Sequence, residues 1–161
     1  MNIKPIIDEI RKNPKGEKTY LIAIDGRSGP GKSFLANKLK EVIPNVTIVS
    51  LDEFDLYEGE ISIQKVINRV INPLKRDQGH NIVIIEGIFS LNSKLESHYD
   101  LKIWVDCPAQ IGYKRGLQRD KDLNGIDNSE KWVNYWLPKE EKYIQTEKPQ
   151  KRADYIIDGS N

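Results

Sequence analysis

Residues 26–33 have the types and the spacing of a phosphate-binding loop. They read GRSGPGKS, which fits the P-loop pattern G-x-x-x-x-G-K-S. Glycines in such a loop let backbone N–H groups face phosphate oxygens, while Lys32 adds an ammonium for the β- and γ-phosphates and Ser33 a hydroxyl for Mg²⁺. The loop therefore predicts binding of a nucleoside triphosphate. The residues expected to contact it are Gly26, Arg27, Ser28, Gly29, Pro30, Gly31, Lys32, Ser33 and Phe34.

Two acidic residues follow apolar, β-branched runs further along the chain. Asp52 comes just after NVTIVS at 45–50, and Glu86 closes NIVIIE at 81–86. The carboxyl ends of parallel strands meet at one edge of a sheet, the edge at which the P-loop would also lie. We expect Asp52 to act as base toward an acceptor hydroxyl or as an indirect Mg²⁺ ligand, and Glu86 to lie on the metal side. A solvated loop or helix cap is the alternative for Asp52 and the favoured interpretation for Asp55.

A basic segment follows a fourth apolar run, LKIWV at 101–105. Residues 108–118 have a helical pattern, and the polar residues 120–125 have the composition of a turn. We expect a mobile lid at about 112–128, with Arg115 and Arg119 stabilising charge on the transferred phosphoryl group. The alternative is an exposed basic helix, which is favoured for Lys114.

The remaining patterns describe the elements that hold these groups in place. Buried strands are predicted at 19–25 and 153–158 besides the three already named, and helices at 3–12, 34–43 and 61–77. This alternation predicts an α/β fold. Trp132, Trp136 and Tyr143 have helical spacing around an interruption at Pro138, so packing is their expected role, with stacking on a planar substrate ring as the alternative.

Composition narrows the class of protein. A chain of 161 residues with 38% hydrophobic and 30% charged residues predicts a single globular domain, residues 1–161. A net charge of +1 argues against nucleic acid and membrane partners. The single cysteine, the lack of a long apolar run and the lack of a signal-peptide core predict a cytoplasmic protein. The sequence is compatible with a monomer and with a homo-oligomer.

Several segments, taken in order, resemble the uridine kinase and phosphoribulokinase branch of P-loop kinases, which also includes nicotinamide riboside kinase. IAIDGRSGPGKS resembles the family's P-loop, VSLDEFDLY its S-x-D-D-F-Y segment, and IVIIEGIFSLN its E-G-I strand. VDCPAQIGYKRGLQRD resembles its lid helix, and KPQKRADYIIDG its last strand.

The resemblance implies a three-layer P-loop NTPase fold, with a five-stranded parallel sheet of order 2-3-1-4-5 and helices on both faces. It also implies ATP, Mg²⁺ and phosphoryl transfer to a small molecule's hydroxyl. The same likeness assigns Asp52 as the base, Ser33 and Glu86 to the metal side, and Arg115 and Arg119 to the lid. Lys32, Asp52, Arg115 and Arg119 are thus the expected catalytic residues, and Arg115 also an expected ATP contact.

The chain departs from the family on the acceptor side. The interval 56–80 is short and lacks the stretches that shape the nucleoside pocket, and Gly112 stands where relatives often have a lid arginine. EKWVNYWLPKEEKYI resembles the tryptophan-centred stretch of nicotinamide riboside kinases. A uridine kinase-like enzyme is therefore the first hypothesis. A nicotinamide riboside kinase-like enzyme and a nucleotide-binding P-loop protein without metabolite kinase activity are the alternatives. A GTPase is disfavoured because the chain has no N-K-x-D motif.

Overall fold

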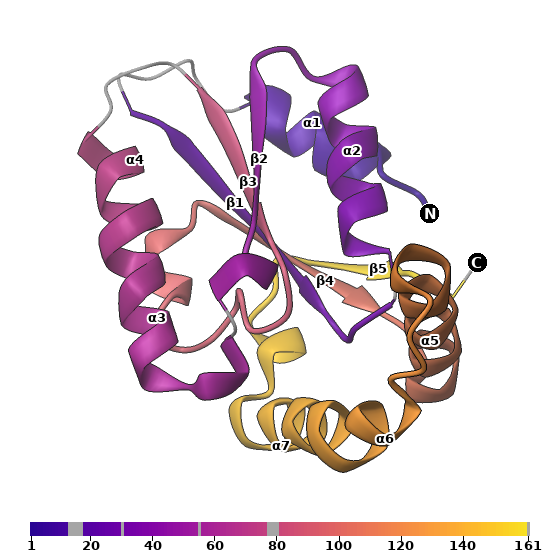
Figure 1. Cartoon of the computed structure of the whole chain (residues 1–161). Coiled ribbons are helices and arrows are strands. Elements are labelled where there is room, and N and C mark those ends of the chain that lie inside the picture. Colours follow the sequence, from indigo (N-terminus) through magenta and orange to yellow (C-terminus); the bar gives the residue numbers. More distant parts are fainter. Residues whose placement is uncertain (13–17, 30, 55, 77–80, 161) are drawn as a thin grey trace.

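A parallel β-sheet forms the middle layer of the protein. The structure is a computed structural model that describes residues 1–12, 18–29, 31–54, 56–76 and 81–160. Its five strands have the order β2-β3-β1-β4-β5, and every neighbouring pair is parallel (Figure 1). The predicted fold class and strand order are therefore confirmed. The strands are β1 (Tyr20–Gly26), β2 (Val46–Ser50), β3 (Ile82–Glu86), β4 (Leu101–Asp106) and β5 (Tyr155–Asp158).

Helices cover both faces of the sheet, because successive strand residues point to opposite faces and the residues on both faces are apolar. Leu21 packs with the helical residues 60–76 and with α7, whereas its neighbour Ile22 packs with α1 and α2. Figure 1 shows these two layers, one on each side of the strands. The α-helices are α1 (Lys4–Lys12), α2 (Lys32–Val42), α3 (Glu60–Val66), α4 (Asn72–Arg76), α5 (Ala109–Asn124), α6 (Ser129–Lys131) and α7 (Leu137–Glu147). None of the helices in the described ranges has the length and apolar composition that a membrane crossing requires.

Two π-helical turns interrupt the helical segments. Residues 67–71 form one between α3 and α4, and Trp132–Trp136 forms the other between α6 and α7. The predicted interruption at Pro138 is wrong. The helical segment runs on through it, and the π-helical turn Trp132–Trp136 lies directly before the first turn of α7, in which Pro138 stands. A local π-helical turn is one of the ways in which a helix accommodates a residue that lacks the N–H group.

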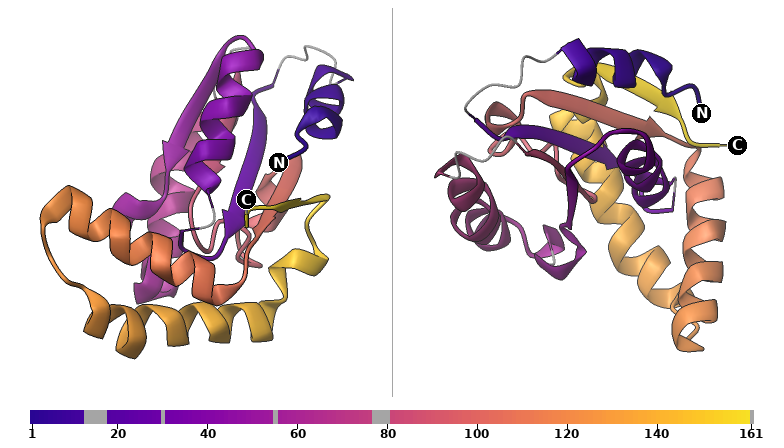
Figure 2. Two further views of the ribbon diagram at one scale, coloured as in Figure 1. Left: turned by 90° about the vertical axis from the view of Figure 1, so that its right-hand side faces the viewer. Right: turned by 90° about the horizontal axis from the view of Figure 1, so that it is seen from above.

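Helix α5 is longer than predicted. The turn expected at 120–125 is wrong, because the helix continues to Asn124 and ends at Gly125, which has a φ of 64°. Asp120 holds this last part in place: its buried carboxylate accepts hydrogen bonds from Trp132 Nε1 at 2.9 Å and Asn128 Nδ2 at 3.3 Å. Asp120 and Trp132 thereby join α5 to the segment that follows it, and Figure 1 and Figure 2 show α5 and α6 next to each other, connected by a short loop.

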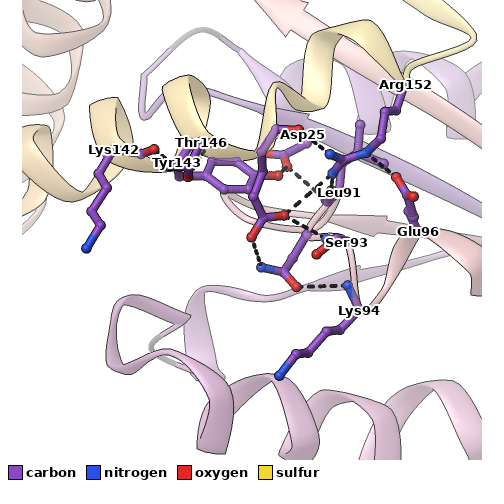
Figure 3. A network of polar contacts seen from close by, with 11 residues as sticks. Asp25, Leu91, Ser93, Lys94, Glu96, Lys142, Tyr143, Thr146 and Arg152 are labelled. Atoms are coloured by element: carbon purple, nitrogen blue, oxygen red, sulfur yellow. Dashed lines mark hydrogen bonds and ion pairs between the residues drawn. The ribbon is translucent and has the colours of Figure 1, made fainter.

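A polar network fixes α7 to the sheet (Figure 3). The buried carboxylate of Asp25 accepts hydrogen bonds from the Leu91 backbone N–H at 2.8 Å and from the Tyr143 hydroxyl at 2.7 Å. Arg152 donates to the carbonyl oxygen of the same Leu91 at 2.6 Å and forms ion pairs with Glu96 and Glu147. The end of β1, the loop after β3 and α7 are thereby held as one unit, which places the first turn of α7 against the P-loop.

Candidate active site

The P-loop joins β1 to α2 and takes the geometry that its glycines permit. Gly29 and Gly31 have φ values of 86° and 96°, which favour glycine over any residue with a Cβ. Among the described residues, no side chain caps the start of α2 at Gly31, so the first N–H groups of that helix remain available to an anion. The predicted contact Pro30 lies outside the described residues. The loop is thus shaped as a receptor for phosphate.

Lys32 is buried at the start of α2 and curls back over the loop. Its ammonium donates hydrogen bonds to the carbonyl oxygens of Gly26 at 3.1 Å and Arg27 at 2.8 Å. Neutral carbonyl oxygens satisfy the amine without neutralising its charge. The lysine therefore keeps a positive charge at the mouth of the loop.

The acidic residues lie at the ends of neighbouring strands. Ser50 of β2 pairs with Glu86 of β3, and Asp52 begins the 3₁₀ turn that follows β2. Burial raises the pKa of Glu86, and the positive charge of Lys32 and hydrogen bonds from Ser33 and Ser50 partly oppose that rise. Asp52 has an exposed side chain and adds its own repulsion to Glu86. Two carboxylates and the Ser33 hydroxyl thus come together beside Lys32.

These oxygen groups fit Mg²⁺ in the way that P-loop proteins hold it. The ion prefers hard oxygen ligands, keeps several waters and takes only one or two protein groups in addition to phosphate oxygens. Among the described residues, no three His, Cys, Asp or Glu side chains form a metal site of their own. Ser33, with Glu86 hydrogen-bonded to it, therefore suits a metal that arrives with the nucleotide.

The two arginines of the predicted lid both border the cleft but have different partners. Arg115 donates to the carbonyl oxygens of Gly159 at 2.5 Å and Ser160 at 2.7 Å. Arg119 lies 3.3 Å from the carboxylate of Asp120, and its side chain is 52% exposed. Arg119 is therefore the freer of the two to turn toward a phosphate.

One cleft of about 480 Å³ brings most of the predicted residues together. Of the predicted nucleotide contacts, Gly26 and Arg27 are absent from its lining, and Arg27 instead forms an ion pair with Glu141 at 2.8 Å. The lining residues named in the sequence analysis are Ser28, Gly29, Gly31, Lys32, Ser33, Phe34, Asp52, Glu86, Arg115, Arg119, Trp132 and Trp136.

Tyr57, Lys131 and Glu140 were missed by sequence reasoning. Tyr57 and Lys131 line the cleft, and the ring centroids of Tyr57 and Trp136 lie 6.4 Å apart. Glu140 lies fully buried behind Ser28 and Tyr57. Its position at i−3 from Tyr143 puts both on one face of α7, and this spacing is the signal that could have marked a buried glutamate.

A strand–loop–helix phosphate site, carboxylates at two strand ends and a basic helix beside them define a P-loop nucleotide-binding protein of the kinase type. The sequence profile of the Phosphoribulokinase / Uridine kinase family matches residues 65–160, more than half of the chain. The chain therefore belongs to this family of P-loop small-molecule kinases, and the predicted membership is confirmed.

Similar proteins agree with this assignment. The uridine kinase of Borrelia duttonii (strain Ly) is 27% identical over an alignment of 175 residues that covers 85% of each chain. A possible uridine kinase from Bacillus stearothermophilus superposes with a TM-score of 0.71 at 21% identity, covering 98% of this chain and 100% of that one. Shikimate kinase from Acinetobacter baumannii in complex with shikimate gives a TM-score of 0.58 at 18% identity, covering 88% and 84%. At these identities the two structures establish a shared fold alone.

Proposed function

We propose that this protein transfers the γ-phosphoryl group of ATP to a hydroxyl of a nucleoside or a related metabolite, as a uridine kinase does. The observation that carries the proposal is the cleft in which Asp52 lies with Lys32 and Ser33 of the P-loop. A carboxylate opposite a phosphate-binding loop suits the proton transfer from an attacking hydroxyl. The uridine kinases that cover most of the chain support the nucleoside acceptor.

Each group has a separate part in the proposed reaction. The N–H groups at the start of α2 and Lys32 hold the phosphates, and Asp52 orients the acceptor hydroxyl and takes its proton as the oxygen attacks the γ-phosphorus. Arg119 stabilises the charge on the transferred group, and Arg115 contributes from the preceding turn of the same face of α5. Mg²⁺, held through Ser33 and through water by Glu86, would neutralise the phosphate charge that develops.

A second candidate, a nicotinamide riboside kinase-like activity, is favoured by the aromatic wall of the cleft. The Trp136 ring attracts positive charge, since the ammonium of Lys131 lies 4.6 Å from its centroid. A cationic pyridinium ring has the same attraction to an aromatic face. Tyr57 and Trp132 extend this wall.

An acceptor screen distinguishes the candidates. ADP release is measured with ATP and Mg²⁺, with and without uridine, cytidine, nicotinamide riboside, pantothenate or a sugar phosphate. A uridine kinase-like enzyme releases ADP in proportion to added uridine, whereas preference for nicotinamide riboside would favour the second candidate. ADP release that no acceptor stimulates would contradict both and indicate a nucleotide-binding protein without metabolite kinase activity.

A further inference from the structure

A buried carboxylate lies directly behind two hydroxyl groups at the wall of the cleft. Glu140, on the first turn of α7, is 0% exposed, whereas Ser28 and Tyr57 both line the cleft. Its Oε1 accepts a hydrogen bond from the Tyr57 hydroxyl at 2.7 Å and another from the Ser28 hydroxyl. Its Oε2 lies 3.3 Å from the Ser28 backbone N–H, which donates to it. In the described part of the chain, no lysine or arginine forms an ion pair with Glu140.

The protons in this cluster can be counted. A carboxylate only accepts hydrogen bonds, and each hydroxyl has one proton to donate. Hydrogen bonds to a charged oxygen are stronger than those between neutral groups, so both protons point to Glu140 rather than across the 3.2 Å between Ser28 Oγ and Tyr57 Oη. Burial and the charge of Glu140 raise the pKa of Tyr57, so the phenol keeps its proton. The two hydroxyl oxygens therefore have only lone pairs left for a ligand.

Negative charges act on the Tyr57 hydroxyl, because Asp52 as well as Glu140 raises the pKa of this phenol. Asp52 lines the same cleft. The ammonium groups of this region have partners of their own: Lys131 is 4.6 Å from the Trp136 ring centroid, and Lys139 is 3.9 Å from that of Tyr135. Lys32 is engaged by the carbonyl oxygens of Gly26 and Arg27. Lys139 also donates to the backbone carbonyl oxygen of Tyr57 at 2.7 Å. These contacts engage the ammonium groups with rings and carbonyl oxygens, while the charge of Glu140 faces the hydroxyl groups of Ser28 and Tyr57.

We infer that Glu140 is a positioning residue for the acceptor: it turns Ser28 and Tyr57 into hydrogen-bond acceptors and so selects an uncharged or cationic polyhydroxyl molecule over an acidic one. This inference rests on the proposed kinase function and specifies its substrate class. A sugar hydroxyl can donate a hydrogen bond to the hydroxyl oxygens of Ser28 and Tyr57. A carboxylate or phosphate at the same place would face the lone pairs of these oxygens and the buried negative charge of Glu140.

The test uses Glu140→Gln, Tyr57→Phe and the double variant in the full chain. Glutamine keeps the shape of the side chain but adds an N–H donor, which lets a hydroxyl proton turn toward the cleft. We expect Glu140→Gln to raise the KM of uridine or nicotinamide riboside, whichever the wild type uses better, by about tenfold, with the KM of ATP within about twofold. Shikimate, an acidic polyhydroxyl probe, should become a stronger competitive inhibitor against that acceptor. Adding Glu140→Gln to Tyr57→Phe should raise the KM by less than it does in the wild type.

The outcomes separate the inference from the function on which it rests. The charge-matched control Glu41→Gln, an exposed residue of α2, should keep wild-type KM values. A wild type that phosphorylates a nucleoside while Glu140→Gln leaves its KM unchanged, or raises the KM of ATP equally, overturns the inference and leaves the kinase function standing. A well-folded Glu140→Gln whose inhibition by shikimate does not increase also overturns it. A wild type that releases no acceptor-dependent ADP removes the proposed function and the inference together.

Discussion

Gly112 of α5 lies against the carbonyl oxygen of Ser28 so closely that an added Cβ would be only 2.5 Å from it. From the other side, a Cβ on Gly29 would be 2.2 Å from the carbonyl oxygen of Gly112. The helix after β4 thus packs directly on the P-loop backbone. This contact explains why glycine stands at position 112 of this chain, where relatives often have a lid arginine, since no side chain fits there.

Gly112→Ala should push α5 away from the P-loop. We expect the free energy of unfolding to fall by about 1–3 kcal/mol, as for other overpacked sites, and the affinity for a non-hydrolysable ATP analogue to fall with it. Urea unfolding and a calorimetric titration measure the two effects. The exposed neighbour Gln110→Ala is the control. Unchanged stability and nucleotide affinity in Gly112→Ala would show that the contact is not tight in solution.

Lys32→Ala should abolish most of the turnover. The variant removes the ammonium that lies over the loop carbonyls, so both phosphate affinity and charge stabilisation are lost. We expect a fall in kcat/KM of at least about 100-fold. Lys40→Ala, at an exposed position of the same helix, should behave like the wild type. Wild-type turnover in Lys32→Ala would rule out the P-loop as the donor site.

Glu86→Gln should change the dependence on Mg²⁺ rather than the affinity for free nucleotide. The carboxylate hydrogen-bonds the Ser33 hydroxyl, and its charge favours a cation beside that serine. Loss of such a supporting carboxylate typically weakens metal binding, so the Mg²⁺ concentration for half-maximal rate should rise about tenfold. A Mg²⁺ titration at saturating ATP measures this shift. Superimposable titrations for wild type and variant would place the ion elsewhere.

Asp25 should make the protein less stable as the pH rises through the weakly acidic range. Burial raises the pKa of Asp25 from 3.8 to about 6, although hydrogen bonds from Tyr143, Leu91 and Gly26 oppose the rise. Between these values the folded state keeps a proton that the unfolded state has lost, so its contribution to stability is present at low pH and lost toward pH 6. The expected loss is about 3 kcal/mol.

The comparison of wild type with Asp25→Asn isolates this group from the other carboxylates. The difference between their free energies of unfolding should change between about pH 4 and pH 6. A carboxyl NMR titration of Asp25 in the wild type checks the same pKa without a variant. A flat difference together with an ordinary titration would contradict the assignment.

Much of the fold was predictable, because short stretches of the sequence encode the strands and the P-loop. The β-branched runs became the strands of the sheet, and the loop at 26–33 has the glycine conformations that its motif requires. Asp52 and Glu86 meet because parallel strands end at one edge, which follows from strand order alone. Arg115 and Arg119 lie beside this edge as expected, and their contact with phosphate stays a prediction.

The rest depends on contacts between distant segments. Glu140 meets Ser28 across 112 residues. Its spacing from Tyr143 marks a shared face of α7, but nothing near it in the sequence identifies the partner that it meets. The polar residues after 118 have turn composition, yet the hydrogen bond from Trp132 Nε1 to Asp120 keeps them helical. Tertiary contacts override local propensity in both cases.

The central claim is that Asp52 serves the transfer step from its position opposite the P-loop, and Asp52→Asn tests it most directly. Its side chain is exposed, so the substitution leaves the fold intact. In a single-turnover assay with ATP, Mg²⁺ and the best acceptor, we expect phosphoryl transfer to fall by at least about 100-fold while the ATP analogue binds with unchanged affinity. Transfer at the wild-type rate by Asp52→Asn would contradict the account.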